Sequence, residues 1–388
     1  MKILLIGEYS NVHWTLGQGL RTLGHQVTVV SDGDRWKNYP RDIDLRRRSL
    51  SVTGTIRYLT DLARIWPRLR GYDVVQLINP VFIDLKGERI WPFYRFLRRH
   101  NGRVFLGAFG IDHYWVRVGM DCKTFRYSDF NFGPTLRSYP FMDTMIADWL
   151  HGPKGALNQR MAEDCDGIIT GLYEYEMCYR PFFPDKTRFI PFPIDRSTVT
   201  PTATLNPNSS ARPAETLDPS RTLNPQPSPL NFFIGIQRAR SAYKGTDIML
   251  AALHRLQADF GPERVGLQVA ESVPFARYQQ MMDSSHVLLD QLYSYTPAMN
   301  ALLAMAKGLI VVGGGEEEQY QLLGETELRP IINVQPTEQD VYDQIARRLL
   351  SGKENIHQLQ MDSVEYIRRH HDHIHVALEY QDFYESQR

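Results

Sequence analysis

The sequence predicts an α/β protein with two domains, each built on a mainly parallel β-sheet. Short apolar runs alternate with amphipathic helical stretches along the 388 residues, a pattern typical of βαβ units. A Pro-, Ser- and Thr-rich segment interrupts this pattern near the middle, and the length suits two domains of ordinary size. We therefore expect an N-terminal domain at 1–195, a linker at 196–230, a second domain at 231–370 and a C-terminal helix at 371–388.

The composition is that of a soluble globular protein, with 43% hydrophobic and 23% charged residues. The sequence contains no run of about 18 apolar residues, so we expect no membrane span. The start, MKILLIGEYS, predicts a strand and is too short in its apolar part for a secretion signal. Cys122, Cys165 and Cys178 have no metal spacing, and an odd number of cysteines gives no disulfide framework. We expect a cytoplasmic protein.

The net charge is zero, but residues 1–110 carry twice as many Lys and Arg as Asp and Glu. This excess suggests an anionic surface or acceptor, including peripheral contact with an anionic membrane at its inner face. A solvated basic face explains the composition equally well, and the Arg46-Arg47-Arg48 run has the same two interpretations. The basic residues are scattered and no nucleic-acid motif occurs, so we expect no nucleic-acid partner.

The first domain opens with a βαβ unit: the apolar strand Lys2–Ile6, a helix at Trp14–Leu23 and a second strand at Gln26–Val30. It lacks G-x-G-x-x-G, so we expect no NAD or FAD. Residues 109–150 are aromatic and irregular, as in a functional segment or lid. Ser51–Arg70 predicts an amphipathic helix. The apolar side of that helix comprises Ile56, Leu59, Leu62, Ile65, Trp66 and Leu69.

The segment 196–230 repeats itself loosely, with TLNP at 204, TLDP at 216 and TLNP at 222. Its few leucines cannot form a core, and we expect a disordered, semi-extended interdomain linker. The second domain then restarts with strands and helices in alternation. The expected elements are Asn231–Ile236, Gly245–Phe260, Val265–Ala270, Tyr278–Met282, Val287–Asp290, Asn300–Ala306, Leu309–Val312 and Ile331–Val334, with helix from Thr337 onward.

Two loops of the second domain have the features of an anion site. Thr296-Pro297 predicts a helix start, since Thr caps free amides and Pro fits the first helical position. A helix amino end suits a diphosphate. The run Gly313-Gly314-Gly315 allows close backbone approach to a ligand. Both loops follow strands of one parallel sheet, so they should flank one crevice.

The chain resembles the GT-B glycosyltransferases, and within them glycosyltransferase family 4. The resemblance is carried by four segments in order: the first βαβ with its GHQVTVV strand entry, IPFPID at 190–195, FFIGIQRARSAYKGTDIMLAAL, and ALLAMAKGLIVVGGGEEEQY. It implies two Rossmann-like domains with an interdomain cleft and a C-terminal helical tail. It also implies transfer of a sugar from a nucleotide-sugar donor, bound by the second domain, to a carbohydrate or lipid-linked acceptor hydroxyl on the first.

The resemblance implies that Arg238 and Lys244 hold the donor diphosphate, where fixed cations stabilise charge on the leaving group. Solvated loop cations are the alternative interpretation. We add Thr296 to this set, and we expect no cofactor beyond the nucleotide-sugar co-substrate.

The chain departs from the family at two glutamate positions, occupied here by Tyr295 and Leu303. Tyr295, Thr296 and Asn300 are the polar side chains that could substitute, with Thr296 and Asn300 on one helix face. Leu303 reads as core. Gly314, Gly315 and Glu318 complete the expected donor-sugar and nucleotide set. An equally good interpretation is that Glu318 and its neighbours simply begin a helix, where the helix dipole favours carboxylates.

The resemblance also places an acid or His near the donor sugar at the end of a strand in the first domain, which corresponds to Asp112 and His113. Either could act as base or orient the acceptor. A simple loop turn is the alternative. His13, in the first loop, is a further acceptor-side candidate. The histidines at 370–375 lack ligand spacing, so we expect a polar surface and no metal site.

Three hypotheses follow for the function. The first is a glycosyltransferase of surface polysaccharide or glycolipid synthesis, for which the family implies a retaining mechanism. The second is a non-catalytic GT-B scaffold that binds a sugar nucleotide or a protein partner, because both glutamates are missing. The third is another GT-B enzyme, an epimerase or a phosphorylase, which no particular residue favours.

Overall fold

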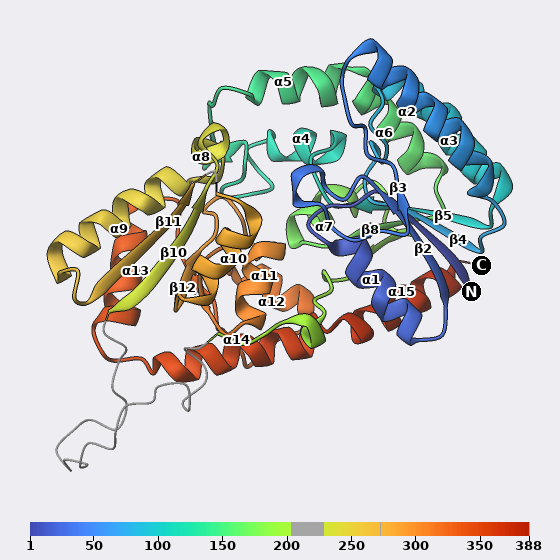
Figure 1. Cartoon of the computed structure of the whole chain (residues 1–388). Helices are drawn as coiled ribbons and strands as arrows, with labels where there is room; N and C mark the ends of the chain where they lie inside the picture. Colours follow the sequence, from blue (N-terminus) through green and yellow to red (C-terminus); the bar gives the residue numbers. More distant parts are fainter. Residues whose placement is uncertain (203–228, 272, 388) are drawn as a thin grey trace. The chain divides into compact units, whose positions relative to one another are not determined.

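The computed structural model describes residues 1–202, 229–271 and 273–387. The chain divides into two compact units, Met1–Asp195 with His370–Arg388 (unit 1) and Arg196–Arg369 (unit 2). Each unit is built on a parallel β-sheet flanked by helices (Figure 1), which confirms the predicted α/β class with two Rossmann-like domains. Most of the predicted linker falls on residues 203–228, outside the described residues.

The main sheet of unit 1 has seven strands in the order β3-β2-β1-β4-β5-β8-β9, and all neighbours are parallel. Residues 3–6 are completely buried, as expected for a strand covered on both faces. Strand β1 lies between β2 and β4, so the direction of strand addition reverses there. The strands are β1 (Lys2–Ile6), β2 (Gln26–Ser31), β3 (Ile43–Asp44), β4 (Val74–Leu77), β5 (Arg103–Ala108), β8 (Gly167–Thr170) and β9 (Thr187–Phe189).

The helices of unit 1 include the last helix of the chain, which packs against the first (Figure 1). A Cβ added at Gly19 of α1 would lie 2.3 Å from the carbonyl oxygen of His373 and 2.8 Å from the Cβ of Ala377. The absence of a side chain at Gly19 therefore permits this close contact. The helices are α1 (Val12–Thr22), α2 (Val52–Ile65), α3 (Gly87–His100), α4 (His113–Gly119), α5 (Met142–Ile146), α6 (Pro153–Asp164), α7 (Tyr173–Tyr179) and α15 (His373–Ser386).

The aromatic segment 109–150 forms α4, a small hairpin of β6 (Asn131–Phe132) and β7 (Thr135–Leu136), α5 and a π-helical turn at Ala147–His151. Trp115 is at its centre. Its ring centroid lies 5.9 Å from that of Phe125, 6.1 Å from that of Phe130 and 5.6 Å from that of Tyr175. The segment thus has a small aromatic core of its own, which includes Tyr175 of α7.

Helix α2 buries only part of its predicted apolar side. Leu62 is 1% exposed, whereas Ile56 is 60% and Leu59 is 39% exposed. Leu50 and Val52, next to its start, are also exposed. The expectation of a single buried stripe is therefore correct for the carboxyl half of the helix and wrong for the amino half.

The sheet of unit 2 has five parallel strands in the order β11-β10-β12-β13-β14. Its core includes Phe232, Leu253 and Val341, which are all fully buried. The strands are β10 (Leu230–Ile236), β11 (Val265–Glu271), β12 (Val287–Leu289), β13 (Ile310–Gly313) and β14 (Ile332–Asn333).

Helices α9 and α13 lie side by side in unit 2 (Figure 1). A 3-10 turn at Arg238–Arg240 and a π-helical turn at Ala346–Leu350 also belong to this unit. No helix in the described parts of the chain is long and apolar enough to cross a membrane. The helices are α8 (Ser241–Lys244), α9 (Thr246–Phe260), α10 (Phe275–Asp283), α11 (Met299–Ala306), α12 (Glu317–Leu323), α13 (Glu338–Ile345) and α14 (Ile356–His370).

The histidines at 370–375 lie at the turn between α14 and α15, and two of them are buried, contrary to the expected polar surface. Burial lowers the pKa of His371 to about 4, so the ring is neutral at pH 7. Its Nδ1–H then donates to the carbonyl oxygen of Phe192 at 2.8 Å. The Nε2 of His373 lies 3.7 Å from the carboxylate of Asp195. These side chains connect the returning C-terminal segment to residues 192–195 of unit 1.

We predict that Gly19→Ala destabilises unit 1 by about 2 kcal/mol, because the added methyl group meets the backbone of α15. Gly→Ala inside a helix normally stabilises a protein by about 0.5–1 kcal/mol, so a decrease in the unfolding free energy would itself indicate the close contact. Urea unfolding followed by circular dichroism measures the change. Thr22→Ala, at an exposed position of the same helix, is the control and should change stability little. Equal or greater stability of Gly19→Ala would contradict the close α1–α15 contact.

Candidate functional site

The predicted donor residues lie at the carboxyl edge of the sheet in unit 2. Strand β10 lies between β11 and β12, so the loops after β10 and β12 leave this edge as neighbours at the switch point of the sheet. The amide of Leu292 donates to the carbonyl oxygen of Lys244 at 3.0 Å, which joins the two loops. Gly245 has a φ of 74°, and a Cβ there would lie 2.9 Å from the Cβ of Leu292. Glycine is therefore required at this crossing.

Lys244 ends α8 and is half-buried at this crossing. Burial raises the pKa of Asp290, the residue directly after β12, while the positive charge of Lys244 and a hydrogen bond from Asn300 act in the opposite direction. The Nδ2 of Asn300 donates to Asp290 at 3.2 Å, and its Oδ1 accepts from the hydroxyl of Tyr278 at 3.0 Å. A chain of polar side chains from α10, α11 and β12 thus holds the carboxylate whose field reaches Lys244.

Arg238, the other predicted diphosphate ligand, lies in the same loop but points to a different strand end. Its guanidinium pairs with Glu271 at the end of β11, and its side chain is 85% exposed. An exposed ion pair of this kind contributes little stability and is easily exchanged for another anion. The structure therefore brings Lys244, and not Arg238, next to the loop that follows β12.

Gly314 and Gly315 are in close contact with other loops of the same edge. A Cβ at Gly314 would lie 2.1 Å from the carbonyl oxygen of Ser294, and one at Gly315 would lie 2.7 Å from Cγ2 of Ile331. The amide of Gly315 donates to the side chain of Asn333 at 3.0 Å. Packing between loops is thus sufficient to require glycine at both positions, whether or not a ligand approaches them.

The expected helix start at Thr296 is wrong. Helix α11 begins at Met299 with Ala298 as its N-cap, and no side chain caps it. Ser294 instead donates from its hydroxyl to the carbonyl oxygen of Thr296 at 2.7 Å, which holds this stretch as a loop. Thr296 therefore does not share a helix face with Asn300. Tyr295 and Thr296 are both buried in this loop, and Leu303 is half-buried on α11.

The three glutamates after the glycines begin a helix, as one of the two interpretations predicts. Glu316 is the N-cap of α12, and Glu317 and Glu318 lie in its first turn, where carboxylates favour the helix dipole. Glu316 accepts from the side chain of Gln335 at 2.9 Å, and Glu317 pairs with Arg329 at 2.8 Å. Glu318 is half-buried.

Asp112 and His113 lie at the carboxyl edge of the sheet in unit 1, at the start of α4. Asp112 is the N-cap; it accepts from the amide of Trp115 at 2.9 Å and from the hydroxyl of Tyr179 at 2.7 Å. Its burial raises its pKa to about 6, against these hydrogen bonds. The Nδ1 of His113 lies 2.8 Å from the carbonyl oxygen of Trp149, and burial lowers the pKa of this ring. Both side chains are enclosed by protein.

His13 lies in the first turn of α1 and not in the preceding loop. Burial lowers its pKa to about 3, so the ring is neutral. Its Nδ1–H donates to the carbonyl oxygen of Gly7 at 2.8 Å, and its Nε2 accepts from the side-chain amide of Gln76 at 3.1 Å. Gln76 in turn accepts from the hydroxyl of Tyr384. His13 is thus part of a buried chain of hydrogen bonds that reaches α15.

The sequence analysis missed two carboxylates, the buried Glu8 and the half-buried Asp290. Glu8 accepts from the amides of His13 at 3.2 Å and Trp14 at 2.9 Å, so it caps α1 from the preceding loop. Burial raises the pKa of Glu8 to about 8. The available signal was the same in both cases: an acidic residue directly or closely after an apolar strand, where a parallel sheet places its ligand-binding edge.

The arrangement in unit 2 suits an anionic ligand. It combines a half-buried lysine, backbone loops packed at a switch point and a carboxylate whose pKa is raised. In the parts of the chain that the structure describes, no group of three or more His, Cys, Asp or Glu side chains could hold a metal ion.

Comparison with known proteins identifies the fold. No protein-family model and no curated protein sequence matches the chain. Among solved structures, sucrose-phosphate synthase from Thermosynechococcus elongatus is 12% identical with a TM-score of 0.61, covering 100% of this chain and 99% of that one. HepE from Anabaena, solved with UDP and glucose, is 10% identical with a TM-score of 0.58, covering 100% of both chains. WaaG, a glycosyltransferase involved in lipopolysaccharide biosynthesis, is 10% identical with a TM-score of 0.54, covering 98% and 99%.

The chain has the GT-B glycosyltransferase fold. The predicted resemblance is thereby confirmed for the fold. In a GT-B fold the edge that carries Lys244 belongs to the second Rossmann-like domain, as the sequence predicts. The assignment to family 4 stays a prediction, and so do the roles of the individual site residues.

We predict that Asp112→Asn makes the protein less sensitive to pH. Because burial raises the pKa of Asp112 from 3.8 to about 6, its ionisation costs stability as pH rises from about 4 to 6, and the full cost remains above that. Asn carries no such cost and still accepts from the amide of Trp115. The unfolding free energy of the wild type, relative to the variant, should fall by about 3 kcal/mol between pH 4 and pH 7.

Urea unfolding at both pH values measures this difference. Tyr179→Phe is the companion variant: it removes a hydrogen bond that lowers the pKa of Asp112, so its own pH-dependent loss should extend to higher pH than in the wild type. A parallel pH dependence of wild type and Asp112→Asn would show that Asp112 is not buried in solution.

Proposed function

We propose that the protein is a glycosyltransferase that moves a sugar from a nucleotide-sugar donor to an acceptor hydroxyl, in the synthesis of a surface polysaccharide or glycolipid. The observation that carries the proposal is the position of Lys244 at the β10/β12 switch point of unit 2, beside the carboxylate of Asp290. The shared fold with HepE, solved with UDP and glucose, and with WaaG, involved in lipopolysaccharide biosynthesis, supports it.

In the proposed reaction the bond between C1 of the sugar and the phosphate oxygen breaks, and a bond from the acceptor oxygen to C1 forms. The acceptor hydroxyl loses its proton, and a nucleoside diphosphate leaves. Negative charge grows on the phosphate oxygens as this bond breaks, so a fixed ammonium there stabilises the transition state more than the ground state. Lys244 supplies that charge. Arg238 would join it by exchanging Glu271 for phosphate, which its exposure permits.

Finer parts of the proposal rest on the resemblance. Retention of anomeric configuration is proposed because family 4 members retain it, and the anomeric proton coupling of the product tests it. For Asp112 and His113 to contact an acceptor, the buried start of α4 must open, since both side chains are enclosed. A cytoplasmic location with contact to an anionic membrane is also proposed, on the excess of basic residues in 1–110.

A second candidate is a non-catalytic scaffold that binds a sugar nucleotide or a protein partner. Two observations favour it. Tyr295 and Leu303 stand where the family has glutamates. The carboxylate of Asp112 already accepts hydrogen bonds from the amide of Trp115 and the hydroxyl of Tyr179. A screen with UDP-, GDP- and ADP-sugars separates the two functions. Thermal stabilisation with hydrolysis or transfer supports the enzyme, whereas stabilisation without turnover on any acceptor supports the scaffold.

We predict that Lys244→Ala lowers sugar transfer at least about a hundredfold, since a lost charge contact to the leaving group costs about 3 kcal/mol in the transition state. The fold should survive because Lys244 lies at the end of a short helix and is half-buried. Turnover of the nucleotide-sugar found in the screen is the measurement, with thermal unfolding as the check on folding.

Arg240→Ala is the matched control. It removes a cation from the same loop, where the Arg240 guanidinium stacks 5.1 Å from the ring centroid of Tyr243. Transfer in this variant should stay within a few fold of the wild type. Wild-type turnover in Lys244→Ala, or an equal loss in both variants, would overturn the assigned role of Lys244.

A further inference from the structure

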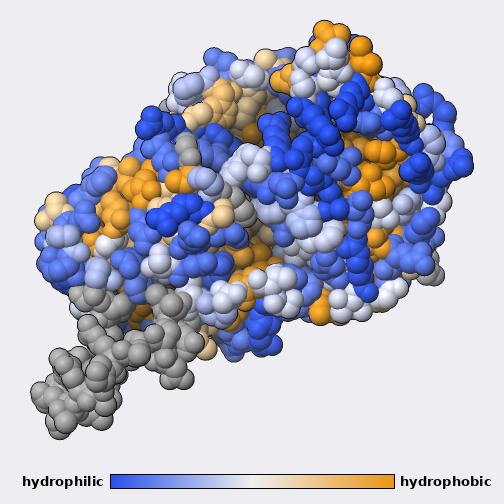
Figure 2. All heavy atoms as spheres, in the orientation of Figure 1, coloured by the Kyte–Doolittle hydropathy of each residue, from blue (hydrophilic) through white to orange (hydrophobic). Residues whose placement is uncertain are grey.

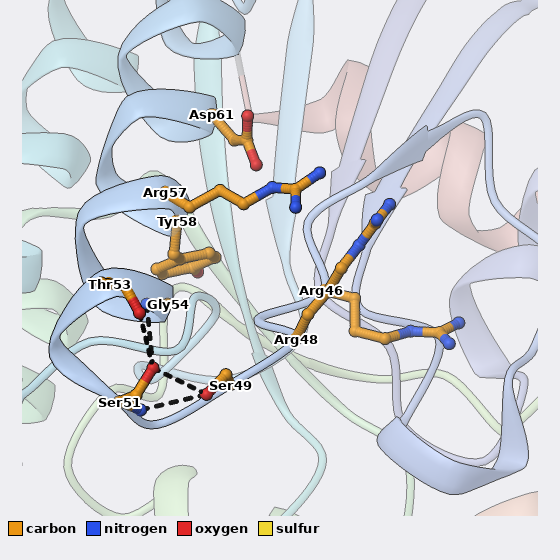
Figure 3. A pocket seen from close by; sticks show the side chains of 9 residues that line it. All are labelled: Arg46, Arg48, Ser49, Ser51, Thr53, Gly54, Arg57, Tyr58 and Asp61. Carbon is orange, nitrogen blue, oxygen red and sulfur yellow. Dashed lines mark hydrogen bonds between the residues drawn. The ribbon is translucent and has the colours of Figure 1, made fainter.

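A cavity of about 360 Å³ opens in unit 1, where the loop after β3 meets the start of α2 (Figure 3). Because β3 is parallel to the other strands of its sheet, the loop that leaves it starts at the carboxyl edge. Figure 3 shows Arg57 projecting from α2 toward the loop that carries Arg46 and Arg48. The lining residues are Arg46, Arg48, Ser49, Ser51, Thr53, Gly54, Arg57, Tyr58 and Asp61.

The guanidinium groups that line this cavity have N–H donors that form no hydrogen bond to the described part of the protein. Within the described residues, Arg48 and Arg57 form no ion pair or hydrogen bond, and the buried Nε–H of Arg46 has no acceptor. By contrast Arg47, which does not line the cavity, donates to the hydroxyl of Thr55 at 2.5 Å, and Arg41 pairs with Asp44 at 3.0 Å. The cavity is therefore lined by guanidinium groups whose donors are available to a ligand.

The other lining groups complement these charges. Ser51 caps α2, accepting from the amide of Gly54 at 3.1 Å, and its hydroxyl lies 3.0 Å from that of Ser49 and 3.1 Å from that of Thr53. These hydroxyls surround the positive end of a 14-residue helix. One carboxylate, Asp61, opposes the three guanidinium groups, and it lies 3.9 Å from Arg64. The net positive charge of the lining strongly favours the binding of an anion.

The edge of the cavity is apolar. Leu50 is 81% exposed, Val52 is 77% exposed and Ile56 is 60% exposed. Figure 2 shows hydrophobic surface beside hydrophilic surface over this end of α2. Exposed large apolar side chains beside a cluster of arginines are typical of surfaces that bind amphiphiles with an anionic head. A free phosphate ion would use the arginines and leave the apolar side chains without a role.

We propose that this cavity binds a phosphate group, and that the apolar edge selects a phosphate carried on a lipid. Arg48 and Arg57 would hold the phosphate oxygens by charge-assisted hydrogen bonds with the seryl hydroxyls of the loop. Leu50, Val52 and Ile56 would contact the acyl region. This site lies wholly in unit 1, is separate from Lys244 and does not depend on the proposed transfer reaction.

The test uses the full chain with the double variant Arg48→Glu/Arg57→Glu, whose changes are at exposed positions. The control is Arg68→Glu/Arg70→Glu, which makes the same charge change at exposed positions beyond the other end of α2. One probe is sedimentation with vesicles of phosphatidylcholine containing one third phosphatidylglycerol. The other is broadening of the ³¹P resonance of inorganic phosphate. Reversal of two charges should weaken binding of the cognate probe at least about tenfold, and the control should change it less than threefold.

The two probes separate the sources of phosphate. Vesicle binding that is lost in the double variant, and also weakened by Leu50→Ser/Ile56→Ser, supports a lipid phosphate. Phosphate binding that is lost in the double variant, without any vesicle binding, supports the site but overturns the selection for lipid. Binding of neither probe by the wild type, or equal binding by the double variant and the control, overturns the site. Sugar transfer by Lys244→Ala tests the donor edge of unit 2, whereas vesicle binding by Arg48→Glu/Arg57→Glu tests this cavity, so failure of one proposal is distinct from failure of the other.

Discussion

The pairing of β10 with β11 on one side and β12 on the other is the constraint on which the donor edge depends. Parallel pairing brings the carboxyl ends of the three strands to one edge, and the reversal of order between them opens the sheet to a ligand there. The contact of Leu292 with Lys244, the requirement for glycine at 245 and the carboxylate of Asp290 all follow from this arrangement. The same constraint operates in unit 1, where β1 lies between β2 and β4.

Both units place carboxylates at these edges and then remove them from water. Glu8 and Asp112 are held by helix amides, and Asp290 by the side chain of Asn300. In each case burial raises the pKa, because the loss of hydration outweighs the hydrogen bonds and charges that favour the ionised carboxylate. Perturbed carboxylates cluster at functional edges more often than elsewhere, since structural positions rarely keep such costly groups. The cost to stability at neutral pH is therefore concentrated where the fold places its ligands.

The architecture could be predicted from the sequence, because the strands of parallel sheets are short apolar runs and the helices between them have apolar residues at regular helical spacing. The sequence also placed Lys244 in the connection between a strand and a helix, as the structure has it, while the role of Lys244 stays a prediction. It failed at Thr296, since the hydroxyl of Ser294 and the contact of Ser294 with Gly314 are tertiary features that hold the loop past the apparent cap. It did not reveal the burial of His13 and His371, because a histidine in a polar stretch gives no sign of burial. The sequence predicted Asp290 only as the last residue of a strand. The side chains that hold its carboxylate, Asn300 directly and Tyr278 through Asn300, come from helices elsewhere in the sequence.

Helix α2 shows most clearly what periodicity can and cannot decide. Its apolar stripe is continuous in the sequence, and the physical preference of each residue for burial is the same at both ends. Leu62 in the carboxyl half is buried, whereas Ile56 and Leu59 lie at the surface although they belong to the same apolar stripe. An apolar stripe that extends past its own core leaves large apolar side chains in water, and it does so beside Arg48 and Arg57, whose guanidinium groups are exposed and available to an anion. The two features have a common explanation if a single amphiphilic ligand contacts both, and scattered surface exposure would not bring them together around one cavity.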